Sequence, residues 1–443
     1  MSPVLNVGID DTDSPRMGCT TYVAALLVNE LTKLGCTFVD YPNLVRLNPN
    51  VPWKTRGNGA MCLRFMCDEK KISPAMRHVK RIVGKNSDLT HVRTDPAIAC
   101  LEGDVPAELN AFSKKVIRSI ATVKEAEKVA KKFKISCVSL KGRKGIIGAI
   151  AAIGETLKGD HTYELIAYRT SRNRSSPRRV DSESIFKMNR ETAPFTFNNI
   201  DPETGRILIT PRGRDPILYG IRGESPEVVL RGRGIVKANE RVERWVIFRT
   251  NHGTDDHLSR ISNIAEVFPH RPVVVTGRVS TMPRTIPGGH VIVTLSDDSG
   301  AIDCAAYEPT GGFRDIVRKL IIGDLVEAHG GIRRGARTHA QTLNLEKIKV
   351  LDLAQDARFE NPRCPKCGKR MESAGRGQGF RCRKCKVDDC TARKKPIIVE
   401  RELALGMYLP PPRAHRHLTK PVSRYGREKT GTGLPLVEPW HWP

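Results

Sequence analysis

Three carboxylates near the start of the chain have the spacing of a metal site. Asp10, Asp11 and Asp13 follow an apolar run of strand length that ends at Ile9. Like charges this close repel one another unless a cation lies among them. Because Mg²⁺ binds one or two carboxylates together with phosphate oxygens, the cluster predicts a magnesium and phosphate site. The alternative is a structural turn in which the Asp side chains only accept hydrogen bonds from the backbone.

A helix start follows the carboxylates directly. Gly18, Cys19, Thr20 and Thr21 open a segment with helical spacing of apolar residues, and Gly35 ends that segment. The first N–H groups of a helix have no partner inside the helix and favour an anion. A strand, an acidic turn and a hydroxyl-rich helix start together suit the binding of a metal ion and phosphate.

Two further loops combine glycine with basic residues. The loop 47–59 carries Lys54 and Arg56 on a backbone rich in Pro, Asn and Gly, which could bring both side chains to a phosphate. The alternative is an ordinary solvated loop, which can have the same composition. The loop 141–148 precedes an apolar helix and could bring N–H groups to a phosphate, whereas its small residues could also serve close helix packing. Its candidate phosphate-binding residues are Gly142, Arg143, Gly145 and Gly148.

Four cysteines near the end of the chain have the spacing of a zinc ribbon. Cys364 and Cys367 form one knuckle, and Cys382 and Cys385 form a second after fourteen intervening residues. Two such knuckles place four thiolates tetrahedrally around Zn²⁺. Because four thiolates fill the coordination shell, we expect a structural zinc, with Cys390 as a lesser candidate ligand.

Composition sets the class of protein. The chain has 443 residues, enough for three or four domains, and 74 Lys and Arg against 48 Asp and Glu give a net charge of +26. This excess of positive charge predicts a nucleic acid or another polyanion as a partner. No apolar run approaches the ~18–20 residues of a membrane span, so we expect no membrane contact and a cytoplasmic location. The twelve cysteines then predict metal ligands and reduced thiols.

The order of the remaining elements predicts two known folds. Residues 60–136 alternate strands and helices as a ferredoxin-like sheet does, with one helix opening at Ser73-Pro74 and another at the capping box of Thr122. Residues 271–351 contain three strands, a helix and two strands, which is the order of an OB-fold. An OB-fold binds oligonucleotides, and the alternative is a small barrel that serves only as a spacer.

Taken together, these motifs resemble the archaeal tRNA-isoleucine 2-agmatinylcytidine synthetases, the TiaS family, over essentially the whole chain. The segments that carry the resemblance are Gly8-Ile-Asp-Asp-Thr-Asp-Ser14, Gly18-Cys-Thr-Thr21, Arg46-Leu-Asn-Pro49, Lys54-Thr-Arg-Gly-Asn-Gly59 and His161-Thr-Tyr-Glu-Leu-Ile-Ala-Tyr-Arg169. The polar loop from Thr250 to Leu258 and the order of OB-fold and ribbon add to it.

The resemblance implies a multidomain α+β architecture with a kinase-like α/β catalytic domain, a ferredoxin-like domain, an OB-fold β-barrel and a zinc ribbon. We expect the catalytic domain to consist of two segments on either side of the ferredoxin-like domain. The expected divisions are 1–59 and 137–197 for the catalytic domain, 60–136 for the ferredoxin-like domain, 198–355 for the OB-fold with an N-terminal extension, 356–395 for the ribbon and 396–443 for a basic tail.

The resemblance also implies a reaction. The family uses ATP to activate the C2 oxygen of the wobble cytidine in an isoleucine tRNA with a CAU anticodon. Agmatine then displaces the activated oxygen, and the product, 2-agmatinylcytidine, reads the codon AUA. The expected cofactors are ATP, Mg²⁺ and Zn²⁺, and no obligate protein partner is expected.

The family pattern assigns roles to individual residues. Asp10, Asp11 and Asp13 would act with Mg²⁺ on ATP, and Thr20 would become phosphorylated. Lys144 stands where a small or apolar residue is expected, which leaves open which basic side chain of its loop meets phosphate. No residue is assigned to agmatine.

A second class of function remains open from the sequence alone. A protein that only binds RNA or single-stranded DNA through its OB-fold and zinc ribbon would explain the charge and the C-terminal part of the chain. Such a protein would not need a cluster of three aspartates beside a glycine-rich basic loop.

Overall fold

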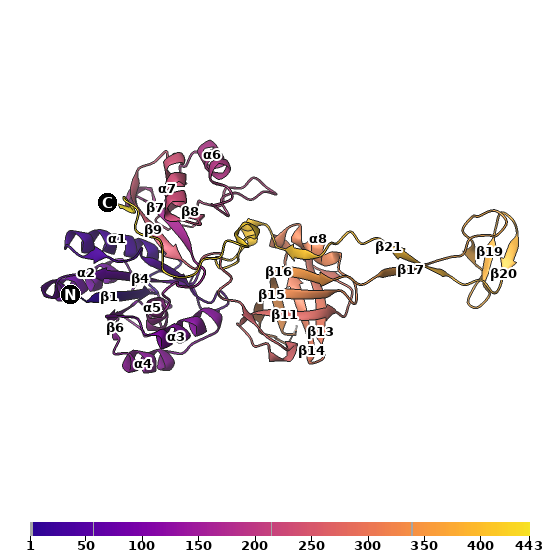
Figure 1. Cartoon of the computed structure of the whole chain (residues 1–443), viewed down its shortest axis with the longest axis horizontal. Coiled ribbons are helices and arrows are strands. Elements are labelled where there is room, and N and C mark those ends of the chain that lie inside the picture. Colours follow the sequence, from indigo (N-terminus) through magenta and orange to yellow (C-terminus); the bar gives the residue numbers. More distant parts are fainter. Residues whose placement is uncertain (1–2, 56, 214, 338–339) are drawn as a thin grey trace.

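The computed structural model describes residues 3–55, 57–213, 215–337 and 340–443. Figure 1 shows three parts: a large body that holds both ends of the chain, a β-barrel beside it, and a small module at the tip of a two-stranded arm. The large body contains a ten-stranded sheet, and the barrel is part of an eight-stranded sheet. No helix among the described residues is long and apolar enough to cross a membrane.

The large sheet joins strands that are far apart in the chain. Its strands in spatial order are β6 (Ser136–Ser139), β5 (Ala97–Glu102), β1 (Val4–Asp10), β4 (Gly59–Met66), β3 (Asn43–Arg46), β9 (Val242–Thr250), β7 (Thr162–Arg169) and β8 (Ile217–Gly223), with β2 (Thr37–Phe38) on β4 and β23 (His441–Trp442) on β9. Strand β1 is antiparallel to both neighbours, so that Val7 faces Leu63 on one side and Cys100 on the other. The parallel pair β3–β9 joins the two halves of the sheet.

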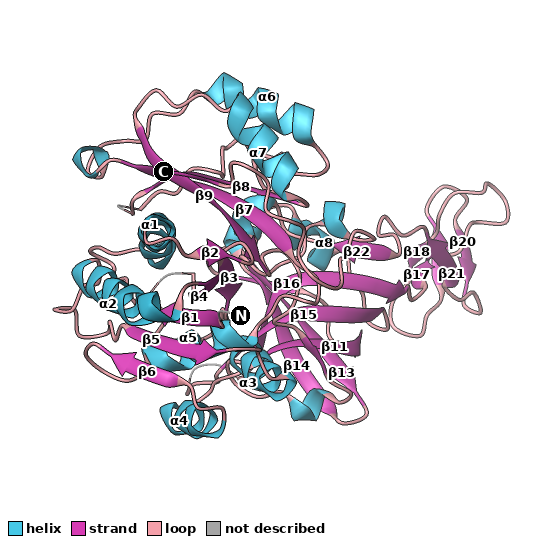
Figure 2. Ribbon diagram, turned by 60° about the vertical axis from the view of Figure 1, so that its left-hand side comes forward, coloured by secondary structure: helices cyan, strands magenta, loops and turns pink. Residues whose placement is uncertain are grey.

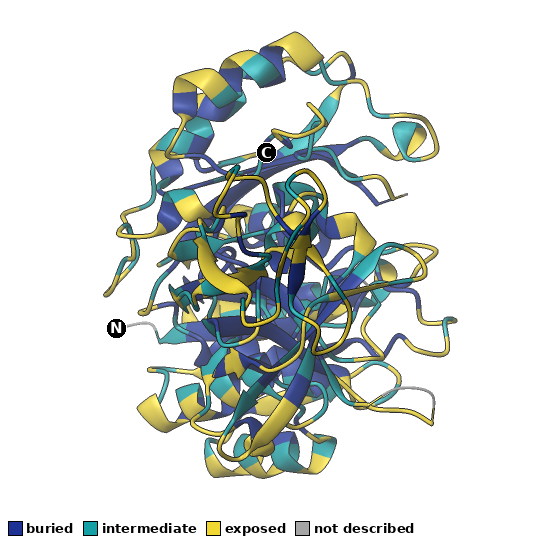
Figure 3. Ribbon diagram, turned by 90° about the vertical axis from the view of Figure 1, so that its right-hand side faces the viewer, coloured by how far each residue is buried: buried dark blue, intermediate teal, exposed yellow. Residues whose placement is uncertain are grey.

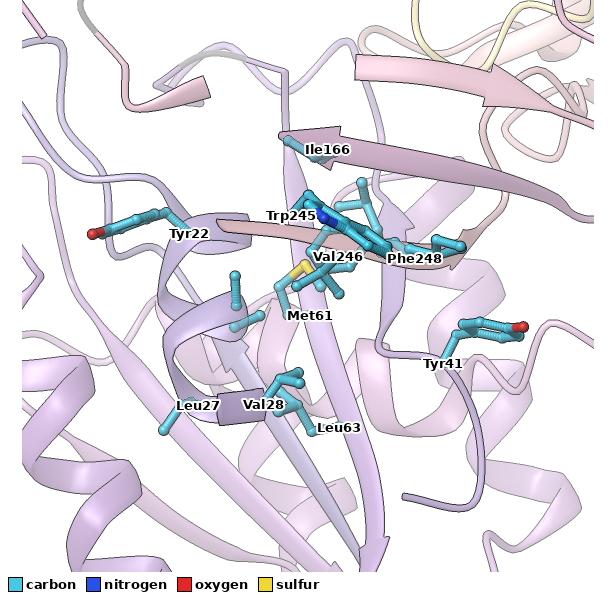
Figure 4. Packing of buried hydrophobic residues seen from close by; sticks show 14 of the residues in the cluster. Tyr22, Leu27, Val28, Tyr41, Met61, Leu63, Ile166, Trp245, Val246 and Phe248 are labelled. Carbon is cyan, nitrogen blue, oxygen red and sulfur yellow. The ribbon is translucent and has the colours of Figure 1, made fainter. Parts of the chain in front are cut away.

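Helices cover both faces of this sheet. The helices of the large body are α1 (Thr20–Lys33), α2 (Glu69–Lys85), α3 (Ala107–Arg118), α4 (Val123–Lys132), α5 (Gly145–Gly154), α6 (Ser182–Thr192) and α7 (Pro226–Ile235). Figure 2 shows α6 and α7 above β7–β9 and α3 and α4 beneath β1 and β5. Helix α5 packs on β1 and β5. In Figure 4, Val28 of α1 lies beside Leu63 of β4, and Met61 points toward Val246 of β9. Buried residues therefore line the sheet on both sides, while the outer helix faces are exposed (Figure 3).

The sheet divides the chain differently from the sequence-based expectation. Because β1 lies between β4 and β5, residues 1–59 and 60–136 form one unit and are not separate catalytic and ferredoxin-like domains. Strands β8 and β9 likewise belong to the large sheet, so the segment 198–258 is no extension of the OB-fold. Local patterns predict that a strand forms, but they do not say which distant strand it will pair with.

Local predictions succeeded where a residue fixes the backbone. The capping box at Thr122 is present at the start of α4, and Gly35 adopts φ +79° after α1.

The helix predicted to open at Ser73-Pro74 instead begins at Glu69 and contains Pro74. The segment after Gly205 makes an isolated bridge between Ile200 and Ile207 and belongs to none of the named strands.

The barrel has the predicted order of elements, with the three-residue strand β12 as an addition before the helix. Its strands and helix are β11 (Pro272–Val279), β12 (Arg284–Ile286), β13 (His290–Asp297), β14 (Gly300–Ala306), α8 (Phe313–Arg318), β15 (Leu325–Arg333) and β16 (Thr342–Asp352), with β10 (Ser259–Arg260) on β11. The parallel pairing of β14 with β16 closes the barrel around an apolar core. The OB-fold prediction is thus confirmed.

The chain leaves the barrel and later returns to it. Strands β17 (Asp356–Glu360) and β21 (Lys395–Val399) pair as the arm, and the module at its tip contains β18 (Glu372–Ser373), β19 (Phe380–Cys382) and β20 (Val387–Asp389). The C-terminal tail, residues 400–443, then pairs with the barrel through β22 (Gly406–Tyr408) and with the large sheet through β23. The tail is therefore an ordered strap across two domains.

Gly8 tests the packing of α5 on β1. A Cβ added to Gly8 would overlap the carbonyl group of Ala149, which is main chain and has little freedom to shift. We expect Gly8→Ala to lower the free energy of unfolding by about 1–3 kcal/mol, the usual cost of overpacking a core. Chemical denaturation measures this change. Gly159→Ala is the matched control, because its methyl group would meet no atom within 4 Å; an equal loss in both variants would contradict the packing argument.

Candidate active site

A cavity of about 560 Å³ lies where the two halves of the large sheet meet. Its walls come from the end of β1, the start of α1, the loop 47–59 and the start of α5 on one side. Strands β7 and β8, the segment 208–217 and one residue of the C-terminal tail form the other side. Segments from across the chain therefore line one cavity.

The three aspartates form an acidic wall of this cavity. Asp10 ends β1, and Asp11 follows in the left-handed backbone region at φ 58°. Burial, and then the neighbouring charge of Asp11, raise the pKa of Asp10 well above its ordinary value. Burial is also the largest cause that raises the pKa of Asp11, to about 6, with repulsion from Asp13 and Asp95 adding to it. The wall has the character of a cation site, since a positive charge would relieve both effects.

The acidic turn is held by a loop that follows α2. The Ser14 hydroxyl donates to Asp88 Oδ2 at 2.7 Å, and Arg16 pairs with the same carboxylate at 3.0 Å. These hydrogen bonds, first among them that of Ser14, hold the pKa of Asp88 below its usual range. Thr94 Oγ1 also donates to the carbonyl of Asp13 at 3.0 Å. The carboxylates are thus fixed from outside and cannot relax apart.

The start of α1 presents hydroxyl groups to the cavity. Thr20 and Thr21 line it, and Thr12 Oγ1 donates to Thr20 Oγ1 at 3.0 Å. The cap residue Cys19 makes no side-chain capping hydrogen bond to the helix. Gly18 lies outside the cavity lining and has φ +87°, with the carbonyl of Thr12 only 2.6 Å from where a Cβ would lie. Its contribution is therefore to the path of the backbone.

The glycine-rich segment that leads into α5 and forms its first turn serves close packing against the acidic wall. A Cβ at Gly148 would overlap the carboxylate of Asp10, and one at Gly142 would overlap that of Asp95. Gly145 packs against the backbone of β5. Only Gly148 of these glycines lines the cavity, so the packing interpretation of this loop accounts for the other two.

The basic side chains of the two loops separate in space. Lys144 lines the cavity, whereas Arg143 pairs with Glu127 on α4 and does not line it. Lys54 also lines the cavity, and burial followed by the charge of Arg416 lowers its pKa. Arg56 lies outside the described residues. Lys144 and Lys54 are therefore the basic groups of these loops that face the acidic wall.

A charged cluster forms the opposite wall. Glu164 on β7 accepts a hydrogen bond from Arg222 Nε at 3.0 Å and one from Arg46 Nη2 at 3.5 Å. Burial alone would raise the pKa of Glu164, but the charge of Arg222 and a contact with His252 hold it well below the ordinary value. Two guanidinium groups share this one carboxylate. The wall keeps an excess positive charge, which suits an anionic group.

An apolar surface completes the cavity beside this cluster. Its side chains are Ile166, Leu208, Ile209, Pro211 and Ile217. Asp215 lies at the edge of the surface and pairs with Arg178 at 3.0 Å. The cavity thus offers an acidic, a basic and an apolar wall within one volume.

The four cysteines predicted to bind zinc come together in the terminal module. Sulfur atoms of Cys364, Cys367, Cys382 and Cys385 all lie within 4.8 Å of one another. Cys390 is exposed and is not part of this group. The donor set matches a structural zinc site, which needs four thiolates at tetrahedral positions. The small apolar core around Met371 and Phe380 leaves the module dependent on such a metal.

Several residues that line the cavity or support its acidic wall were not identified as site residues from the sequence. Glu164 is a carboxylate inside a fully buried strand, and that contrast with its apolar neighbours is the signal that could have singled it out. Arg222 and Asp88 lie in segments whose local pattern resembles any charged strand or loop. His417 lies far along the chain, so only its position in the folded structure identifies it.

Four known domain families match successive parts of the chain. They are the TiaS TCKD domain at residues 6–142, the TiaS FLD domain at 143–257, an OB-fold nucleic acid binding domain at 273–351 and the TiaS C-terminal zinc ribbon domain at 361–403. The first of these spans the unit in which β1 lies between β4 and β5, and the junction with the second falls near residue 142.

Named proteins match nearly the full length. The 2-agmatinylcytidine synthetase TiaS of Staphylothermus marinus, named for an isoleucine tRNA, is 43% identical over 437 residues, 96% of this chain and 95% of that protein. The same enzyme of Methanocaldococcus jannaschii is 43% identical over 94% of this chain and 97% of its own. A crystal structure of TiaS in complex with this isoleucine tRNA and ATP has 39% identity and a TM-score of 0.86 over 95% of this chain and 97% of that chain. A complex of TiaS with the same tRNA, AMPCPP and agmatine has 37% identity and a TM-score of 0.85 over the same shares.

The cysteine cluster predicts a metal-dependent module. Cys364→Ser should remove one ligand, so that zinc is lost and the terminal module unfolds, because binding of the metal supplies the folding free energy of so small a core. Elemental analysis of the purified protein measures zinc content. Cys390→Ser is the control and should keep one zinc per chain, since Cys390 lies outside the cluster. Retention of zinc by Cys364→Ser would contradict the assignment.

The raised pKa of Asp11 predicts a pH-dependent cost to stability. A carboxyl whose pKa rises on folding, here from 3.8 to about 6, binds its proton more tightly in the folded state. The free energy of unfolding therefore falls as pH increases through this range. With a chelator present to remove metal ions, Asp11→Asn should raise the melting temperature at pH 7.5 by about 2 °C or more. The same substitution should change the melting temperature little at pH 4, where the Asp11 carboxyl is protonated in the folded protein. A shift of equal size at both pH values would show that charge is not the cause.

Proposed function

The chain belongs to the TiaS family, and from this premise we propose that it is an ATP-dependent 2-agmatinylcytidine synthetase acting on isoleucine tRNA. Its substrates are ATP, agmatine and the isoleucine tRNA with a CAU anticodon. It forms a C–N bond between agmatine and C2 of the wobble cytidine, so that the modified base pairs with A and the tRNA reads AUA. The observation that carries the proposal is the family identity over nearly the whole chain, together with a cavity that combines acidic, basic and apolar walls.

The chemistry requires activation of a poor leaving group. The C2 oxygen of cytosine does not leave readily. Transfer of a phosphoryl group to this oxygen turns it into part of a phosphate leaving group. The amine can then form a bond to C2 while the bond between C2 and the phosphate oxygen breaks. Phosphoryl transfer depends mainly on alignment and on neutralising the charge of the phosphate oxygens. The cavity supplies both means, because cationic side chains and a helix start surround the place where the carboxylates converge.

The acidic wall is suited to Mg²⁺. Asp10, Asp11 and Asp13 would hold the ion, and their partly buried, mutually repelling carboxylates are the feature of this structure that fits it. When bound, Mg²⁺ neutralises phosphate oxygens and orients them for in-line transfer. The loop carrying Asp88 and Thr94 keeps these carboxylates close together, whether or not a cation is present.

The start of α1 and two lysines are suited to the phosphates of ATP. The N–H groups of the first turn of α1 favour an anion, and Lys54 and Lys144 add positive charge across the cavity. Thr20 is the first residue of α1 and lines the same cavity, which supports the proposal that its hydroxyl lies near the bound phosphates. We assign Thr20 as the threonine that accepts phosphate in the family pattern.

The apolar wall is suited to agmatine. Ile166, Ile209 and Ile217 offer a surface that matches the methylene chain of agmatine between its amine and its guanidinium. An apolar surface also lowers the cost of presenting the amine uncharged, since burial disfavours the ammonium form. We place the methylene chain against these residues.

The remaining domains are suited to tRNA. An OB-fold and a zinc ribbon that carries many Lys and Arg contact nucleic acid through phosphates and bases. Because tRNA is modified and used in the cytoplasm, we propose a cytoplasmic location. The alternative of a purely RNA- or DNA-binding protein leaves the acidic wall and its supporting loop without a purpose.

Substitution of single carboxylates separates catalysis from binding. Asp10→Asn and Asp13→Asn keep the size of each side chain but remove a charge that a metal–ATP complex requires. Each variant should lose at least about 100-fold in formation of 2-agmatinylcytidine, on the scale of removing one group that stabilises transition-state charge. Mass spectrometry of the tRNA nucleosides measures the product, and filter binding measures tRNA affinity, which should change less than about two-fold. Full activity in both variants would overturn the assignment.

A further inference from the structure

The C-terminal tail contributes a side chain to the cavity. His417 lines it, although the rest of the lining comes from the first 222 residues. The carbonyl of His417 accepts a hydrogen bond from the N–H of Gly253 at 2.8 Å, and that of Leu418 accepts one from Asp255 at 2.8 Å. Arg416 on one side donates to Asn50 Oδ1 at 2.7 Å, and Arg424 on the other pairs with Asp160 at 2.8 Å. The tail therefore holds His417 from both directions.

The His417 ring packs against a second histidine ring and over a glycine, beside an arginine side chain. Its imidazole meets the ring of His252 edge to face, with 5.1 Å between centroids. It also lies directly over Gly57, where an added Cβ would be 2.5 Å from Nε2 of His417 and 3.5 Å from Nη1 of Arg46. The charge of Arg46, and then burial, lower the pKa of His417 well below its ordinary value. The ring thus stays neutral beside the guanidinium of Arg46.

Arg46 retains donors that the protein does not use. Nη1 donates to the carbonyl of Gly57 at 3.2 Å, and Nη2 reaches Glu164 at 3.5 Å, the outer limit of a hydrogen bond. Nε is buried and has no hydrogen-bond partner among the described residues. A buried, unsatisfied donor on a charged group is costly unless a ligand meets it. Nε itself has almost no exposed surface, but Arg46 lines the cavity, so a ligand there would meet the remaining N–H groups of Nη1 and Nη2.

We propose that His417 is a positioning residue, which keeps the Arg46 guanidinium turned into the cavity so that it binds a phosphate group of ATP or of the tRNA backbone. The inference rests on the proposed synthetase function. The His417 ring fills the space over Gly57 beside Arg46 Nη1, and in this proposal it limits the rotation of the guanidinium toward Glu164. Without the ring, Arg46 would close its long contact with Glu164 and be lost to the ligand.

Steady-state kinetics of the full-length protein test this assignment. In His417→Ala, the KM for one phosphate-bearing substrate should rise about ten-fold, the scale of one charge-assisted hydrogen bond, while kcat changes less than about two-fold. A rise for ATP at saturating tRNA identifies ATP as the source of the phosphate, and a rise for tRNA at saturating ATP identifies the backbone. His417→Gln, which keeps an uncharged planar group, should recover most of the loss.

Two controls separate positioning from folding. His415→Ala removes a tail histidine that bonds to the carbonyl of Pro410 and does not line the cavity, and it should leave both KM values unchanged. In an Arg46→Lys background, His417→Ala or His417→Gln should add less than about two-fold, because the two residues act as one unit. Multiplicative effects of the two substitutions, or unchanged KM values in a folded His417→Ala, would overturn the proposal. Inactive wild-type protein would instead refute the synthetase function.

Discussion

Mutual repulsion among Asp10, Asp11 and Asp13 is the constraint that the structure around the cavity must balance. Burial makes the repulsion stronger, since the pKa of Asp10 and of Asp11 both rise on removal from water. An unsupported turn would open and let the carboxylates reach solvent. The hydrogen bonds from Ser14 to Asp88 and from Thr94 to Asp13 prevent that opening. The protein thereby keeps three carboxylates close together at a cost to its own stability.

The same logic explains the close approach of α5. Gly148 and Gly8 have no side chains, so α5 packs directly on β1 and its first turn lies against Asp10. The partial positive charge at the start of a helix favours a nearby carboxylate. A glycine-rich loop next to a phosphate site is usually interpreted as a cradle for phosphate. Here the glycines let the backbone support the acidic wall, and Lys144 is the basic residue of that loop that faces the cavity.

The sequence predicted those features that depend on neighbours along the chain. The capping box at Thr122, the order of strands in the OB-fold and the four zinc-binding cysteines each depend on local spacing, and each is present. The division between residues 59 and 60 failed because β1 pairs with strands on both sides of it. A pattern of neighbouring residues singled out the acidic cluster and Thr20, which line the cavity. The same kind of pattern could not single out Glu164 and Arg222. The first group is contiguous, whereas the second meets only when β7 and β8 pair.

The route of the chain through the terminal module bears on how independent the cavity is. The chain leaves the barrel along β17 and returns along β21, and only residues 400–416 separate that arm from His417. Within that short stretch, β22 pairs with β16, and Arg416 binds Glu346 at 3.1 Å. Both contacts lie on the barrel side of His417, between the arm and the cavity. Coupling between distant sites needs an element with two stable arrangements, and this stretch is held to the barrel at two points. The tail therefore completes the cavity wall from a segment anchored on the barrel, and the path along the chain from the terminal module to the cavity passes through those two anchors.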